Sequence, residues 1–349
     1  MATIGSRKDD HIELTTHEAV GFREKTTLFE CVRLVHDALP ELSFDEIDTS
    51  LEVFGKRLSA PILIAGMTGG TERAQRINRE LAALADELGL AFGLGSQRAM
   101  QKEPASVESY RVRDVAPNVL LLGNLGAVQA TATPTDGVRG LIDAVGADAL
   151  CVHLNPSMEL VQAEGDRDFR GCLATLSRLA RDLGVPVIAK ETGSGLSAPV
   201  ARRLLAAGVR HVDVSGAGGT SWVAVETLRA PSERKGLGET FWDWGIPTAA
   251  SVALVAAEPF ETVFATGGVT SGLDVARAIA LGATVGGIAR PVLRALEAGG
   301  PEGARALLER VRTELRMAML LVGARDLGAL RGAPRVIVGE LAEWMAQAR

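Results

Sequence analysis

Short apolar segments alternate with amphipathic stretches along most of the chain. Each apolar segment is rich in β-prone residues and ends in small or polar residues. Because the segments lack a regular alternation of apolar and polar positions, they are typical of parallel strands that are covered on both faces. The sequence therefore predicts strands over 61–67, 91–96, 119–124, 149–155, 186–191, 211–216, 262–268 and 284–289.

The stretches between these strands predict helices, such as those over 73–88, 169–183, 199–207 and 272–281. Strands that alternate with helices indicate βαβ units, and eight such strands indicate a closed (β/α)8 TIM barrel. An open doubly wound sheet is the alternative, but no Gly-x-Gly-x-x-Gly turn follows the first strand. We expect an α/β protein with a barrel over 61–349, preceded by an arm and barrel-capping segment over 1–60.

One connection is much longer than the others. About 45 residues separate the sixth strand from the seventh, and this segment contains Trp222, Trp242 and Trp244, three of the four tryptophans. Long loops at the carboxyl ends of barrel strands are usually functional. We therefore expect a long loop after the sixth strand that acts as a lid or a binding loop.

Composition narrows the class of protein. Hydrophobic residues make up 47% of the chain, enough for one large core, and a net charge of −6 argues against a nucleic-acid-binding surface. The sequence contains no run of about 18 apolar residues, the length that a membrane-spanning helix needs. The start of the chain does not resemble a signal peptide. Cys31, Cys151 and Cys172 fit neither a zinc site nor a disulfide framework. We expect a cytoplasmic protein that binds neither nucleic acid nor membrane.

Candidate chemistry lies where the strands end, since barrel enzymes build their sites there. Gly267-Gly268 after the seventh strand and 286–290 around the eighth predict a phosphate site, because glycine lets backbone N–H groups approach an anion. Lys190 ends an apolar strand and is expected to point into the barrel mouth, where its charge would stabilise negative charge on a cofactor ring. Ordinary turns and a surface lysine are the alternative interpretations.

Several motifs together resemble the type 2 isopentenyl diphosphate isomerases over nearly the whole chain. They are Arg7-Lys8-x-x-His11, Met67-Thr-Gly-Gly70, Gly95-Ser-Gln-Arg98, Gly123-Asn124, His153-Leu-Asn155, Glu164-Gly-Asp-Arg-Asp-Phe169, Lys190-Glu191, Ser215-Gly-x-Gly-Gly-Thr220 and Gly267-Gly268. The resemblance implies interconversion of isopentenyl and dimethylallyl diphosphate with FMN, Mg²⁺ and NADPH as flavin reductant. It also implies that reduced flavin takes part in proton transfer, and that the protein is a homo-oligomer of four or eight subunits.

The resemblance further implies roles for individual residues. The implied FMN contacts are Gly66, Met67, Thr68, Ser96, Asn124, Lys190, Ser215, Thr220, Gly268, Val269, Thr270, Ala289 and Arg290. The implied diphosphate contacts are Arg7, Lys8, His11, Ser96, Gln97, Arg98, His153 and Asn155. Glu159 would bind Mg²⁺, which suits an ion that prefers one or two carboxylates plus phosphate oxygens. Glu226 would lie beside the alkene, with Met158 at the second catalytic position.

Two positions depart from the family pattern. Met158 replaces a glutamine, and a methionine is apolar and cannot relay a proton. Thr270 replaces an arginine that commonly follows Gly-Gly-Val, a milder change because a backbone contact can survive it.

Three hypotheses therefore stay open. They are the isomerase itself, a related flavoenzyme acting on another prenyl diphosphate or by redox chemistry, and a non-catalytic flavin or prenyl-diphosphate binding protein. A 2-hydroxy-acid oxidase is set aside, since it needs a late catalytic histidine and no histidine follows His211.

Overall fold

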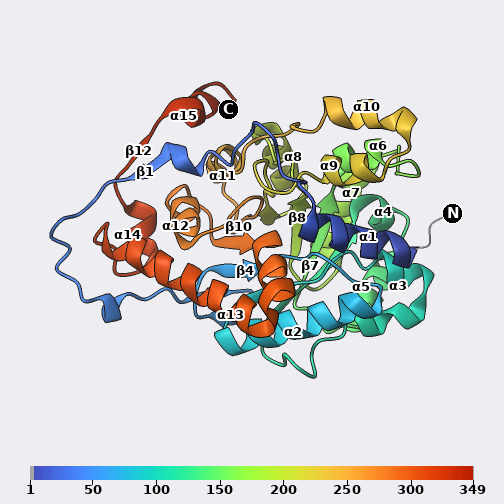
Figure 1. Ribbon diagram of the computed structural model, residues 1–349, viewed down its shortest axis with the longest axis horizontal. Coiled ribbons are helices and arrows are strands. Elements are labelled where there is room, and N and C mark those ends of the chain that lie inside the picture. The colour runs from blue at the N-terminus through green and yellow to red at the C-terminus, as the bar shows by residue number, and fades with distance from the viewer. Residues whose placement is uncertain (1–3, 349) are drawn as a thin grey trace.

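Eight parallel strands form a closed barrel in the computed structural model, which describes residues 4–348 and the side chains from Lys8 onward (Figure 1). The strands are β4 (Ile62–Ile64), β5 (Ala91–Gly93), β6 (Leu120–Gly126), β7 (Ala149–Leu154), β8 (Val187–Glu191), β9 (His211–Asp213), β10 (Thr262–Ala265) and β11 (Val285–Ile288). The barrel closes where β11 pairs with β4, in a register that places Ile288 opposite Ile64. The predicted fold class and all eight predicted strands are confirmed.

Helices surround the barrel and include the four that the sequence predicts. They are α2 (Glu72–Leu88), α3 (Arg98–Lys102), α4 (Ala127–Thr131), α5 (Thr135–Asp143), α6 (Pro156–Val161), α7 (Cys172–Asp182), α8 (Ala198–Ala206), α11 (Thr248–Val255), α12 (Gly272–Ala280), α13 (Arg290–Leu320), α14 (Leu327–Gly332) and α15 (Gly339–Gln347). Side-chain caps fix where helices begin: Thr71 accepts a hydrogen bond from the Ala74 N–H at the start of α2, and Ser271 caps α12.

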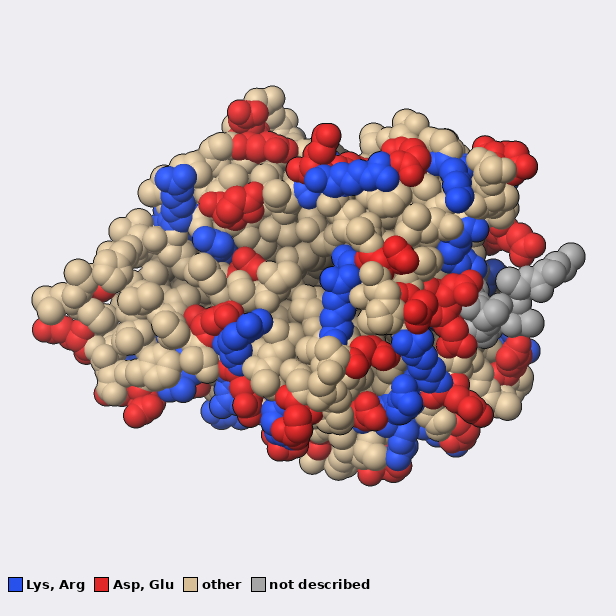
Figure 2. Space-filling model, in the orientation of Figure 1, with Lys and Arg blue, Asp and Glu red and all other residues tan. Residues whose placement is uncertain are grey.

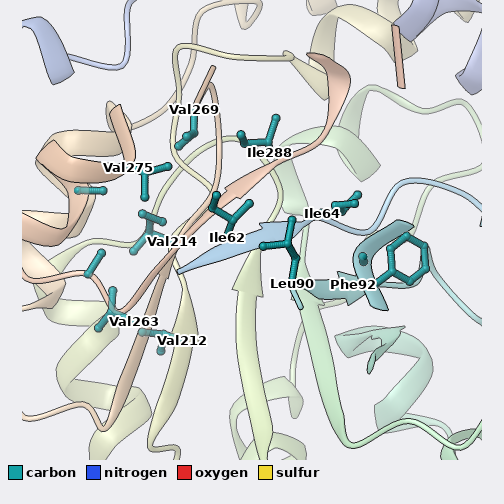
Figure 3. Close-up of a cluster of buried hydrophobic side chains, with 14 of the residues drawn as sticks. Ile62, Ile64, Leu90, Phe92, Val212, Val214, Val263, Val269, Val275 and Ile288 are labelled. Atoms are coloured by element: carbon teal, nitrogen blue, oxygen red, sulfur yellow. The ribbon is translucent and has the colours of Figure 1, made fainter. Parts of the chain in front are cut away.

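Side chains alternate between the two faces of each strand, which separates two apolar layers. Ile62 and Ile64 of β4 point outward and belong, with Val275 of α12, to the cluster of buried side chains beneath the helices (Figure 3). Leu63 points inward and packs with residues such as Leu122 in a second cluster inside the barrel. Side chains in a strand alternate between its two faces, so every second residue points into the barrel. The residues that continue this inward series beyond the apolar ones therefore point toward the barrel mouth.

The described part of residues 1–60 contacts both ends of the barrel. α1 (Ile4–His17) packs against α9 (Trp222–Arg229) and α13 at the mouth (Figure 1). At the opposite end, β2 (Leu51–Val53) and β3 (Lys56–Leu58) form a hairpin whose apolar residues join the cluster inside the barrel. β1 (Val32–Leu34) pairs with β12 (Arg335–Ile337) near the end of the chain. This segment therefore covers the barrel rather than forming a separate core.

The long connection after β9 is largely helical. It contains α9, α10 (Ser232–Thr240) and the barrel helix α11, whereas the sequence predicted a loop. α10 escaped prediction because it is polar and carries Gly236 and Gly238, residues that disfavour helix. Trp242 is buried and its indole N–H donates to the Gly21 carbonyl at 2.9 Å, which ties this insertion to the N-terminal segment.

The molecular surface carries both charge signs. Lys and Arg side chains are interspersed with Asp and Glu over the face in Figure 2, as expected for a protein with a modest net negative charge. No helix within residues 4–348 is both long enough and apolar enough to cross a membrane.

Candidate active site

A cavity of about 720 Å³ lies at the carboxyl ends of the barrel strands. With the exception of Gln97 and Glu226, every predicted site residue whose side chain is described lines this cavity. The side chain of Arg7 lies outside the described part of the chain, so its predicted role stays a prediction. The structure thus gathers residues from eight strand ends, from α1 and from α6 around a single space.

One wall of the cavity is built from glycine backbone. Gly267 and Gly268 have φ values of 96° and 77°, in the left-handed region that glycine adopts readily. A Cβ added at Gly219 would lie 2.4 Å from the Gly268 nitrogen, so the two loops touch through their backbones. Such a wall lets backbone N–H groups approach a phosphate closely.

A buried hydroxyl elsewhere in the cavity lining has an open hydrogen-bonding capacity. Thr68 Oγ1 is buried and has no hydrogen-bond partner among the described residues. Buried polar atoms in native proteins almost always have a partner, so an unpartnered one beside a cavity indicates a site for a polar ligand. Together with the glycine wall, this hydroxyl fits a large phosphorylated cofactor such as FMN.

A buried ion pair lies at the floor of the cavity. Lys190 Nζ donates to Asp213 Oδ2 at 2.6 Å and to Thr266 Oγ1 at 3.1 Å. Thr266 Oγ1 in turn donates to Asp213 Oδ1 at 2.7 Å. Lys190 and Thr266 line the cavity, whereas Asp213 lies behind them.

The predicted diphosphate residue Gln97 is placed in the wall rather than on its surface. Its side chain is fully buried, with Oε1 accepting from the Asn124 N–H at 2.9 Å and Nε2 donating to the Leu141 carbonyl at 2.9 Å. One end of this amide therefore holds β6 and the other end holds α5. The structure does not bring Gln97 to the space where the other predicted diphosphate residues meet.

His153 is held at the cavity wall in its neutral form. Its Nδ1 lies 2.8 Å from Asn124 Oδ1. Burial, reinforced by the positive charges of Lys8, Lys190 and Arg98, lowers the pKa of His153 to about 3. The same three cations make the cavity attractive to an anion.

Glu159 is a carboxylate with spare lone pairs at the cavity wall. Its Oε1 accepts from Asn155 Nδ2 at 2.9 Å and its Oε2 accepts from the Asp166 N–H at 2.8 Å. Among the described side chains there is no group of three or more His, Cys, Asp and Glu that could hold a metal ion. One carboxylate fits Mg²⁺ only if substrate phosphates and water complete its shell, as this ion commonly allows.

Glu226 lies behind the cavity wall in a charged network. His11 Nε2 is 2.8 Å from Glu226 Oε1, and Arg229 donates to Glu226 Oε2 at 2.9 Å. Burial lowers the pKa of His11 even though its hydrogen bond with Glu226 acts in the opposite direction. Glu226 does not line the cavity itself but is separated from it by His11, which does. The His11 ring packs edge-on against Trp222.

The residues at this site that sequence reasoning missed include two in the ion-pair cluster and two polar ones in the cavity lining. Asp213 and Thr266 complete the ion pair, while Gln129 and Arg294 line the cavity. Asp213 and Thr266 could have been found from the two-residue alternation of side chains along a strand. Asp213 pairs in register with Lys190 on the neighbouring strand, and Thr266 lies two residues beyond the inward-facing Phe264.

Comparison with known proteins first defines the class. The chain matches the family model described as FMN-dependent dehydrogenase over residues 3–109 and 105–336. Lactate oxidase of Pediococcus acidilactici superposes with a TM-score of 0.68 and 16% identity, covering 97% of this chain and 96% of that one. A mandelate oxidase variant gives 0.66 and 20%, covering 93% and 95%. At such low identity these two structures show the barrel fold alone.

Within that class the chain belongs to the family of type 2 isopentenyl-diphosphate delta-isomerases, as the motifs predicted. It is 47% identical to the isopentenyl-diphosphate delta-isomerase of Thermococcus onnurineus and 48% identical to that of Thermococcus kodakarensis, in each case over 98% of this chain and 93% of the relative. The enzyme of Methanosarcina barkeri is 44% identical over 99% and 96%.

Proposed function

We propose that this protein interconverts isopentenyl diphosphate and dimethylallyl diphosphate, with FMN, Mg²⁺ and NADPH as the flavin reductant. The observation that carries the proposal is that one cavity is lined by residues from both predicted sets. Thr68, Lys190 and Gly268 represent the FMN set, and Lys8 and Arg98 the diphosphate set. The names of the relatives support the same reaction. A homo-oligomeric state and a cytoplasmic location stay predictions.

The residues of this chain would hold and neutralise the diphosphate. Lys8 and Arg98 would donate charge-assisted hydrogen bonds, and neutral His153 would add a hydrogen bond without adding charge. Glu159 would share Mg²⁺ with the phosphate oxygens. Reduced FMN, when bound, supplies a group that can donate and accept a proton at the allyl unit.

The proposed role of Glu226 follows from its partner. Because Glu226 is buried and bonded to His11, we assign it to orienting the imidazole and to exchanging a proton through Nε2. His11, which lines the cavity, would then be the group through which Glu226 acts on the substrate. The proposal thus gives Glu226 an indirect path to the substrate.

A related flavoenzyme that acts on a longer prenyl diphosphate is the second candidate, and Met158 favours it. The side chain lines the cavity, with its sulfur 3.9 Å from Asn155 Nδ2. A flexible thioether contacts hydrocarbon well and adapts its shape to it. The two candidates differ in the length of the substrate chain that the pocket accepts.

Turnover assays with each component omitted test the proposal. Isopentenyl diphosphate should be converted only when FMN, a reductant and Mg²⁺ are all present. In the Glu159→Gln variant the Mg²⁺ concentration for half-maximal activity should rise, whereas Glu343→Gln, an exposed control on α15, should behave as wild type. Conversion that is independent of FMN would refute the proposal.

A further inference from the structure

Asp213, Thr266 and Lys190 form a closed hydrogen-bonded cluster whose donors and acceptors are mutually consistent. The Thr266 hydroxyl donates its hydrogen bond to Asp213 Oδ1, so its lone pairs can accept a hydrogen bond from Lys190 Nζ. Asp213 Oδ1 also accepts from the Ser215 N–H at 3.2 Å, and its Oδ2 accepts from the ammonium. Asp213 therefore has both carboxylate oxygens engaged and cannot turn without breaking several bonds.

The cluster leaves one direction open for the ammonium group. A lysine ammonium has three N–H donors. Two of those on Lys190 are directed to Asp213 and Thr266, and Lys190 lines the cavity. The remaining N–H is therefore available to a ligand in the cavity, in an orientation that the two partners determine.

Fold stability alone gives a weak reason for this ion pair. Side chains of Lys190 and Asp213 are 10% and 3% exposed, so both charges have lost most of their hydration. The loss of hydration in buried ion pairs often cancels their mutual attraction, and apolar residues can replace them without loss of stability. A buried charge pair directly at a cavity instead suggests a role toward the ligand.

We infer that Asp213 is a positioning residue, which with Thr266 aims the Lys190 ammonium at the ring system of the bound flavin. The inference rests on the proposed function, because it requires FMN in this cavity. A cation held beside the ring stabilises the more negative, reduced cofactor and so raises its reduction potential. Asp213 does not line the cavity and acts only through Lys190.

The reduction potential of bound FMN tests this role in four variants. Lys190→Met should lower the potential. Asp213→Asn should lower it in the same direction, because the loss of the aimed ammonium outweighs the loss of the carboxylate charge, which lies behind the cavity lining. The double variant should show no larger shift than Lys190→Met alone, since both changes remove one interaction. Asp148→Asn removes a carboxylate from another partly buried ion pair, with Arg113, and serves as the matched control that leaves the potential unchanged.

Several results would overturn the inference. They are an unchanged or raised potential in Asp213→Asn, or shifts that add in the double variant. If Asp213→Asn does not fold, Thr266→Val carries the test: a lowered potential is expected, and an unchanged one contradicts the inference. Wild-type protein that takes up no FMN would refute the proposed function as well. A shift in Lys190→Met without one in Asp213→Asn would refute only the role of Asp213.

Discussion

At the scale of single residues, Met158 places a thioether where the family pattern has a glutamine. A methionine cannot relay a proton, and general acid–base assistance is typically worth about 10²–10⁴-fold in rate. We expect slow but measurable isomerisation by the wild type and a kcat raised about tenfold or more in Met158→Gln. Met317→Gln, the same change at an exposed position on α13, should have no effect. Equal kcat values in wild type and Met158→Gln would show that position 158 does not limit the chemistry.

His153 makes the stability of the protein depend on pH. Its pKa is about 3 in the folded protein and about 6.5 when unfolded, so protonation favours the unfolded chain. The stabilisation is complete above about pH 6.5 and is lost as the pH falls toward 3, with a loss of about 2 kcal/mol by pH 5. Urea denaturation between pH 7 and 5 should show a shallower decline of unfolding free energy for His153→Gln. Parallel declines would contradict the assigned cause.

At the scale of elements, α1 is held at its end and contributes side chains from its middle. Arg290 donates to the carbonyls of Thr15 and Glu18 at 2.9 and 2.7 Å, and so satisfies carbonyls that the end of a helix leaves open. Lys8, earlier in the helix, reaches the Ser96 carbonyl at 3.4 Å and lines the cavity. The helix therefore connects the cofactor end of the site with the diphosphate end.

This arrangement predicts a separation of substrate binding from cofactor binding. Lys8→Ala and Arg7→Ala should each weaken isopentenyl diphosphate binding by about tenfold to 150-fold, because a charge-assisted hydrogen bond contributes about 1.5–3 kcal/mol. FMN affinity should not change in either variant. Isothermal titration with each ligand checks this, with the exposed Lys102→Ala as control. Wild-type substrate affinity in both variants would assign α1 a covering role only.

The elements differ in how far the sequence could predict them. The barrel strands were predictable because each combines an apolar run with a polar end, as in Val187–Glu191. α10 was not, since it is polar and carries Gly236 and Gly238. The packing of the segment that follows α10 also depends on contacts with residues far away in the chain. Trp242, for example, donates a hydrogen bond to the Gly21 carbonyl, and the Arg23 guanidinium covers its ring.

At the scale of the whole molecule, the barrel geometry brings the site together, because inward-facing positions of neighbouring strands meet at the mouth. The inward row changes from apolar to polar near the mouth: Ile188 is followed by Lys190, and Cys151 by His153. This change could be read from the sequence by counting alternate positions. The pairing of Lys190 with Asp213 could not, because it depends on the register between β8 and β9. The position of Gln97 in the wall could not either, because it depends on a contact with Leu141 of α5.

We propose above all that this barrel moves a proton across the allyl unit of a five-carbon diphosphate. The most direct measurement is ¹H NMR of isopentenyl diphosphate in D₂O with the protein, FMN, Mg²⁺ and NADPH. We predict that dimethylallyl diphosphate signals grow and that deuterium enters the exchanging positions of substrate and product. Unchanged isopentenyl diphosphate, in a sample whose FMN is bound and reduced, would contradict the claim.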